Sequence, residues 1–195
     1  MEEIARRLRR WTSRHPEWEE DVGAVALESD DGVVLIDPID PPRELRTPEH
    51  VLLTVFWHYR STPNLRPKRV WASSRTVKAL ANRSVTVTDP IARGVLLPGG
   101  IQPYETARHG ELVYWLPEQR AVVVGDVLLG AGAKPRPTGD ALRLCPERWL
   151  GKSTHADLRE SLRPLLDLPV QRVLVSHGTP VLRAGKRALE QVIGA

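Results

Sequence analysis

An apolar run over residues 51–56, interrupted only by Thr54, constrains the fold of this chain more than any other feature. A strand with one face in water alternates apolar and polar residues, so a nearly unbroken run indicates a strand buried on both faces. Such a strand needs a further layer on each side of its sheet. The chain has two strand-rich halves, each followed by expected helices, and this order predicts sheets packed face to face with helices outside.

The expected elements follow from periodicity, turn residues and helix caps. Apolar runs indicate strands at residues 22–27, 33–36, 51–56, 69–72, 84–88, 111–116, 121–124 and 173–176. Helical spacing indicates helices at residues 2–10, 73–82 and 155–168, the last of these capped by Thr154, and a final helix that ends near Ile193. Turns at residues 29–32 and 117–120 join strands into hairpins, and residues 130–139 form a Gly- and Pro-rich loop.

Length and composition limit the class of protein. With 195 residues, 41% of them hydrophobic, we expect residues 1–195 to form a single domain. The sequence shows neither a signal-peptide pattern nor an apolar run of membrane-helix length, so we expect a cytoplasmic protein without a membrane partner. Cys145 is the one cysteine, which excludes an intrachain disulfide. The net charge of +4 comes from basic residues mixed with acidic ones, so nucleic acid is not an expected partner.

Four motifs occur in an order that is typical of one fold family. They are Val33-Val34-Leu35-Ile36-Asp37-Pro38, Val51-Leu52-Leu53-Thr54, Leu112-Val113-Tyr114-Trp115-Leu116-Pro117 with Val122-Val123-Val124-Gly125-Asp126, and Val173-Leu174-Val175-Ser176-His177-Gly178. In this order they resemble the metallo-β-lactamase superfamily, from about residue 22 to the C-terminus. The resemblance implies an α/β fold, an αββα sandwich of two mixed β-sheets with helices on the outer faces. It also implies that Asp126 and His177 correspond to metal ligands of the family.

The chain departs from the family at its His-x-His-x-Asp-His motif. When Thr54 is aligned with the threonine before that motif, the ligand positions are held by Val55, Trp57, Tyr59 and Arg60. None of these side chains is a usual zinc ligand. The family's middle histidine falls near Ala107, and only a shifted alignment brings His109 to its place. The resemblance therefore implies a degenerate metal site, and we expect no cofactor.

Zinc at a rebuilt site is the alternative. His58 lies in the altered loop and can join Asp126 and His177 as a third ligand, with His109 or Asp37 as a further candidate. We assign metal ligands only for this rebuilt site, and none for a degenerate one.

Arg60 supports a different hypothesis, in which a guanidinium replaces the metal. Without metal, the Asp126 carboxylate would be buried without a positive charge beside it, which is costly. Arg60 can bind that carboxylate through two parallel hydrogen bonds. The alternative is that Arg60 points to solvent and backbone amides satisfy Asp126. Asp37 also has two interpretations, as a ligand-binding residue or as a turn residue that caps nearby amides.

Three functions remain open from the sequence. The first is a non-catalytic or small-anion-binding protein, with Arg60 and Asp37 as ligand-binding residues. The second is a metal-dependent hydrolase of an ester or thioester at the rebuilt site. The third is metal-free acid–base catalysis by His177 or His58, with Asp126 as the orienting partner. No serine or cysteine lies in a Gly-x-Ser-x-Gly elbow, so the sequence offers no recognisable nucleophile.

Aromatic residues gather near the N-terminus. Trp11, His15 and Trp18 can form one wall of a ligand pocket, or they can pin the terminus to the core. Such clusters are more often structural, and we favour the second interpretation.

Overall fold

A seven-stranded and a four-stranded β-sheet form the centre of the computed structural model, which describes residues 1–15, 17–92 and 95–194. The strands of the larger sheet lie in chain order: β1 (Glu2–Ala5), β2 (Leu8–His15), β3 (Glu20–Ser29), β4 (Gly32–Ile36), β5 (His50–Leu52), β6 (Arg69–Ser73) and β7 (Asp89–Ile91). Strands β1 to β4 pair antiparallel, whereas β4 to β7 pair parallel, so the sheet is mixed.

The smaller sheet has the strand order β13-β10-β9-β8. Its strands are β8 (Gln102–Glu105), β9 (Leu112–Leu116), β10 (Ala121–Val124) and β13 (Arg172–Val175). The β10–β13 pair is parallel and the other two pairs are antiparallel, so this sheet is mixed as well. A separate two-stranded ribbon consists of β11 (Leu128–Gly130) and β12 (Leu142–Leu144).

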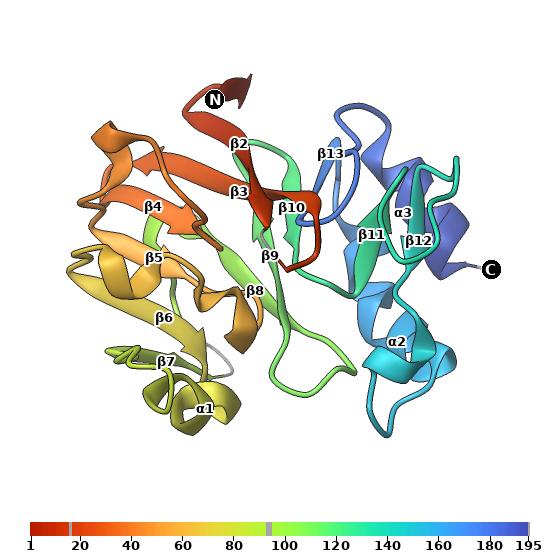
Figure 1. The fold of residues 1–195 in the computed structure, drawn as a ribbon. Coiled ribbons are helices and arrows are strands. Elements are labelled where there is room, and N and C mark those ends of the chain that lie inside the picture. Colours follow the sequence, from red (N-terminus) through yellow and green to blue (C-terminus); the bar gives the residue numbers. More distant parts are fainter. Residues whose placement is uncertain (16, 93–94, 195) are drawn as a thin grey trace.

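Helices cover the outer sides of the two sheets. Figure 1 shows α1 (Val77–Ala81) beside β6 and β7, and α2 (His155–Leu162) and α3 (Gly185–Ile193) beyond the smaller sheet. Short 3-10 helices lie in the connections: η1 (Arg43–Leu45), η2 (Phe56–Tyr59), η3 (Thr62–Asn64), η4 (Ser74–Thr76), η5 (Pro98–Gly100), η6 (Glu147–Trp149) and η7 (Arg163–Asp167).

Alternate side chains of one strand pack into different apolar clusters, and this alternation accounts for the layers of sheets and helices. In β4, Ile36 packs in the cluster that both sheets share, whereas Leu35 packs in the outer cluster of the larger sheet. In β9, Tyr114 belongs to the shared cluster, and Trp115 belongs to the cluster that includes residues of α2 and α3. Full burial of one large apolar side chain contributes roughly 1.5–3 kcal/mol, so apolar residues are favoured on both faces of these strands. The expected αββα sandwich is confirmed.

Two expected strands differ from the structure. Strand β5 ends at Leu52, before residue 56, because the Thr54 amide donates to the Asp37 carboxylate instead of a neighbouring strand. The strand expected at residues 84–88 is wrong, and pairing with β6 begins only at Asp89. The amides of residues 83–85 donate to carbonyl groups at the end of α1, so they are not free to form a ladder.

The helix expected at residues 155–168 is present in two pieces. Helix α2 begins with the capping box of Thr154 and Asp157, which confirms the expected cap. It ends at Leu162 and continues as η7, because Pro164 lacks the N–H that the next helical hydrogen bond requires.

Residues 2–10 form strands and a turn, so the helix expected there is wrong. Arg7 has a φ of 62°, which marks the turn between β1 and β2. Strand β2 pairs with β3 from Leu8 to His15, and Arg9 forms an ion pair with Glu28 of β3. A short isolated helix is marginally stable in water, so pairing with a long neighbouring strand overrides helical propensity.

The helices in the described ranges include none that is both long enough and apolar enough to cross a lipid bilayer.

Candidate metal centre

Four strands end close together, and the residues that follow them form a buried polar cluster. In the larger sheet, Asp37 follows β4, and His58 lies in η2 after β5. In the smaller sheet, Asp126 lies just beyond β10 and His177 just beyond β13. Strands β4 and β5 are parallel neighbours, and so are β10 and β13, so their carboxyl ends share one edge of each sheet. Packing of the two sheets brings these edges together.

His58 is buried between two carboxylates. Its Nδ1 atom lies 2.8 Å from Asp37 Oδ2, and its Nε2 atom lies 3.1 Å from Asp126 Oδ1. In the neutral ring that carries its proton on Nδ1, this nitrogen donates a hydrogen bond to Asp37, and the lone pair of Nε2 is directed toward Asp126. The amide and hydroxyl of Thr54 donate to the two carboxylate oxygens of Asp37, at 2.8 and 2.5 Å. Asp37 therefore lies behind His58 and orients it, instead of facing the cleft as a ligand-binding residue.

His177 has the same arrangement on the other side of Asp126. Its Nδ1 atom lies 3.3 Å from Glu20 Oε2, and its Nε2 atom lies 3.2 Å from Asp126 Oδ1. Burial alone would lower the pKa of His177, but the adjacent carboxylates of Asp126 and Glu20 outweigh it and raise the pKa to about 9. The ring of Trp18 stacks on the imidazole, with the two ring centroids 5.1 Å apart.

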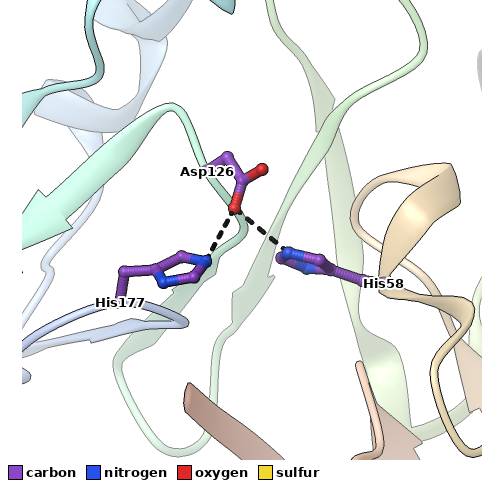
Figure 2. A group of neighbouring side chains, drawn as sticks. All are labelled: His58, Asp126 and His177. Atoms are coloured by element: carbon purple, nitrogen blue, oxygen red, sulfur yellow. Dashed lines mark ion pairs between the residues drawn. The ribbon is translucent and has the colours of Figure 1, made fainter. Parts of the chain in front are cut away.

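The Asp126 carboxylate lies between the two imidazole rings. Figure 2 shows His58 and His177 on opposite sides of it, each directed at the same oxygen. This oxygen, Oδ1, is buried and has no partner of hydrogen-bond geometry among residues 1–15, 17–92 and 95–194. The three side chains each offer a ligand atom, and these atoms lie within 4.8 Å of one another.

The donor set fits a divalent metal ion. Two imidazole nitrogens and one carboxylate oxygen are common zinc ligands. In metal sites, the second nitrogen of a ligating histidine usually donates to a carboxylate or carbonyl, and Asp37 and Glu20 accept such bonds here. The sequence expectation that no cofactor is required therefore gains no support from the structure.

The same fold occurs in solved structures. A metallo-beta-lactamase family protein from Thermus thermophilus aligns with a TM-score of 0.65 and 19% identity, over 97% of this chain and 79% of that chain. A metallo beta lactamase from Erythrobacter litoralis aligns with a TM-score of 0.68 and 12% identity, over 99% and 95%. This chain has the metallo-β-lactamase fold. The mono-zinc form of the metallo-beta-lactamase FIM-1 from Pseudomonas aeruginosa aligns with a TM-score of 0.60 and 12% identity, over 96% and 90%.

The amino-acid sequence matches neither a protein-family model nor a curated protein. The similarity to these solved structures is therefore one of fold.

In this metallo-β-lactamase fold, the guanidinium that compensates Asp126 comes from Arg108, not from Arg60. Arg108 Nη1 lies 3.4 Å from Asp126 Oδ2. Trp57, at one of the replaced motif positions, donates from Nε1 to the same oxygen at 2.7 Å. Arg60 Nη1 instead donates to the main-chain oxygen of Asp37 at 3.4 Å. The guanidinium beside the Asp126 carboxylate is thus that of Arg108, from another loop, and the contact between Arg60 and Asp126 that the sequence offered as one alternative is not among the described hydrogen bonds and ion pairs.

Glu111 fixes the loop that carries Asp126. Its Oε1 atom accepts the amides of Asp126 and Val127, at 2.6 and 2.9 Å, and its Oε2 atom lies 3.2 Å from Arg108 Nη1. Burial, and then repulsion from Asp126, raise the pKa of Glu111 to about 7. A Cβ atom at Gly125 would lie 2.8 Å from Glu111 Oε1, so only glycine permits this close approach.

A cleft of about 570 Å³ opens onto the cluster, and its volume is typical of small-molecule sites. Its wall includes His15, Trp18, Tyr59, Arg60, Arg83 and His177. Arg60 is half-buried and has a strained backbone, with φ 31° and ψ −107°. In the described part of the chain, no carboxylate pairs with its guanidinium.

The aromatic residues near the N-terminus divide between two roles. Trp11 is buried and donates from Nε1 to the carbonyl oxygen of Ile39 at 2.7 Å, so it pins the terminus as expected. His15 and Trp18 line the cleft instead. Burial, and then the charge of Arg60, lower the pKa of His15, which keeps its imidazole neutral near pH 7.

The sequence does not mark Glu20, Arg108 or Glu111 as residues of the site. Their signal was weak, because charged residues beside a strand are common and nothing in the spacing marks these three. His109, which was a candidate ligand, is exposed and lies outside the group formed by His58, Asp126 and His177.

Proposed function

We propose that this chain is a metal-dependent hydrolase that holds one divalent ion, with zinc as the first candidate, between His58, Asp126 and His177. One observation carries the proposal: both Nε2 atoms face the same Asp126 oxygen, while each Nδ1 atom is bound to a carboxylate. This arrangement leaves the Nε2 lone pairs free to bind a metal ion when the rings are neutral.

A divalent ion bound there would supply Lewis-acid polarisation of a substrate carbonyl group. Arg60 binds an anionic group of the substrate, because its guanidinium lines the cleft and has no carboxylate partner among the described residues. His15 takes the proton of the attacking water and returns it to the leaving group, since its neutral ring lines the same cleft. The substrate class that suits these groups is an ester or thioester of a small organic anion.

Metal analysis of the purified full-length chain tests the proposal. We expect about one zinc ion per chain by elemental analysis after chelation and reloading, and loss of that ion in His58→Ala. The matched control is His155→Ala, because His155 is half-buried and lies outside the site. Hydrolysis of a panel of carboxylate-bearing esters and thioesters should require the metal and should fail in His58→Ala. Protein that takes up no zinc even at saturating concentration would refute the proposal.

A second candidate function is metal-free binding of a small anion in the same cleft. It is favoured by the charges of the cluster, because Arg108 and a protonated His177, whose pKa is raised to about 9, can neutralise Asp126 without a metal. Chelated protein that binds inorganic phosphate or acetate, and loses this binding in Arg60→Gln, would support this function. Ester hydrolysis by chelated protein would instead favour acid–base catalysis by His58 or His177.

A further inference from the structure

We infer that Arg108 is a permanent cation of the site that occupies the outer oxygen of Asp126 and thereby limits the site to one metal ion. The inference rests on the proposed metal site and concerns how many ions that site accepts. It starts from the unequal surroundings of the two Asp126 oxygens. Oδ1 faces His58 and His177, whereas Oδ2 faces Trp57 and Arg108.

The second oxygen of Asp126 is already bound. Trp57 Nε1 donates to Oδ2 at 2.7 Å, and Arg108 Nη1 lies 3.4 Å from it. A guanidinium and an indole N–H are donors without a lone pair, so neither can become a metal ligand. An ion at Oδ2 would have to displace both groups and would lie beside a positive charge.

Arg108 is held in place from several directions. Its side chain is only 11% exposed, and its Nη1 atom also lies 3.2 Å from Glu111 Oε2. The guanidinium carbon lies 4.4 Å from the ring centroid of Trp57 and 5.8 Å from that of Trp149. Arginine keeps its proton at every pH of interest, so this charge is permanent.

The turn that carries Arg108 is also fixed. The Thr106 hydroxyl accepts the Arg108 amide at 3.2 Å, and the Glu111 amide donates to the Arg108 carbonyl at 3.1 Å. Ser153 and Ser161 bind the main chain of Ala107 from the segment before α2 and from α2 itself. Arg108 therefore meets Asp126 and Glu111 in a position set by the surrounding structure.

The balance of charge agrees with this role. Asp126 and Glu111 are two buried carboxylates, and Arg108 Nη1 lies 3.4 Å from an oxygen of the first and 3.2 Å from an oxygen of the second. A single guanidinium between them does what a second metal ion would otherwise do, namely reduce their repulsion. A divalent ion can then bind at the His58 and His177 side without a second cation opposite it.

The test counts and titrates metal in the full-length chain by native mass spectrometry and by competition with a chromophoric chelator. We expect one zinc ion per wild-type chain at saturation. Arg108→Gln removes the charge, so it should bind zinc at least tenfold more tightly or accept a second ion. Arg108→Lys keeps the charge, so it should bind one ion with an affinity within about threefold of wild type.

Two controls separate charge from other effects. Trp57→Phe removes a neutral donor from the same oxygen, so it should raise zinc affinity less than Arg108→Gln does. Arg75→Gln removes an equal charge from an exposed ion pair with Glu105, so it should leave affinity unchanged. If Arg108→Gln does not fold, the wild-type ion count and the Arg108→Lys titration still decide the matter.

The outcomes are distinct for the inference and for the proposed function. Two ions per wild-type chain would overturn the inference and leave a metal-dependent hydrolase standing. One ion with equal affinities in wild type, Arg108→Gln and Arg108→Lys would also overturn only the inference. No ion in the wild-type chain would overturn the proposed function, and the inference with it.

Discussion

Glu111 holds Asp126 by its backbone: one carboxylate oxygen accepts the Asp126 amide at 2.6 Å, and the other pairs with Arg108 beside the Asp126 side chain. The carboxylate that we propose as a metal ligand is thus positioned by a second, fully buried carboxylate. Glu111 precedes β9 and Asp126 follows β10, so the arrangement depends on the pairing of these two strands.

We expect Glu111→Ala to lower the free energy of unfolding by about 3–5 kcal/mol, because it leaves two buried amides without an acceptor and removes one of the two carboxylates beside Arg108. Glu111→Gln should cost less, since its amide oxygen still accepts both N–H groups. Urea denaturation monitored by tryptophan fluorescence measures both changes. The control Glu105→Ala removes an exposed carboxylate and should change stability by less than about 1 kcal/mol. Equal losses in Glu111→Ala and Glu105→Ala would contradict the role of Glu111.

Asp37→Asn should weaken zinc binding by about 10- to 100-fold, the usual cost of losing an outer partner of a metal ligand. The reason is that Asp37 Oδ2 accepts a hydrogen bond from His58 Nδ1 at 2.8 Å and so sets the orientation of the ring. Chelator competition measures the affinity. Asp40→Asn alters an acid at the rim of the cleft that binds Ser13, and it should leave the affinity unchanged. Unaltered zinc affinity in Asp37→Asn would show that His58 needs no such support.

Arg60→Gln should weaken binding of a carboxylate-bearing substrate by about 10- to 100-fold, as expected for the loss of one charge-assisted hydrogen bond. A neutral ester of similar size should be affected much less, because it offers no anionic group to the cleft. The comparison of KM for the two substrates, in wild type and variant, checks this. A similar rise in KM for both substrates would mean that Arg60 shapes the cleft without recognising charge.

The metal-free protein should lose stability as the pH rises toward 10. The pKa of His177 is about 9 in the folded chain and near 6.5 when unfolded, so its protonated form stabilises the fold fully below about pH 6.5. That contribution is lost as the pH passes through about 9. Melting temperatures of chelated protein between pH 6 and 10 measure the change, and His177→Gln should show a flatter profile above pH 7. A wild-type profile as flat as that of the variant would argue against the His177–Asp126 ion pair.

Zinc should reverse part of this trend, because a metal ion takes the place of the proton on the imidazole nitrogen. Zinc-loaded protein should therefore retain its melting temperature at pH 9 better than chelated protein does.

The sequence by itself determined the layers of this protein. Apolar runs such as residues 121–124 and 173–176 lack the polar alternation of a half-exposed strand, and burial on both faces requires a covered sheet. The family resemblance implied that Asp126 and His177 lie in one site and, only in the alternative of a rebuilt site, that His58 joins them; the three side chains do lie together. Local signals fixed the cap at Thr154.

Tertiary structure alone decided the N-terminal strands and the partner of Asp126. Residues 2–10 have helical spacing, but a short isolated helix is only marginally stable in water. The hydrogen bonds between β2 and β3 outweigh this helical preference. The sequence offered Arg60 as the partner of Asp126, whereas the structure places Arg108 beside that carboxylate. The turn at residues 106–111 is held between the two sheets and α2, and its position decides which guanidinium reaches Asp126. Contacts between distant segments leave no periodic pattern in a single sequence, so the sequence does not reveal this pairing.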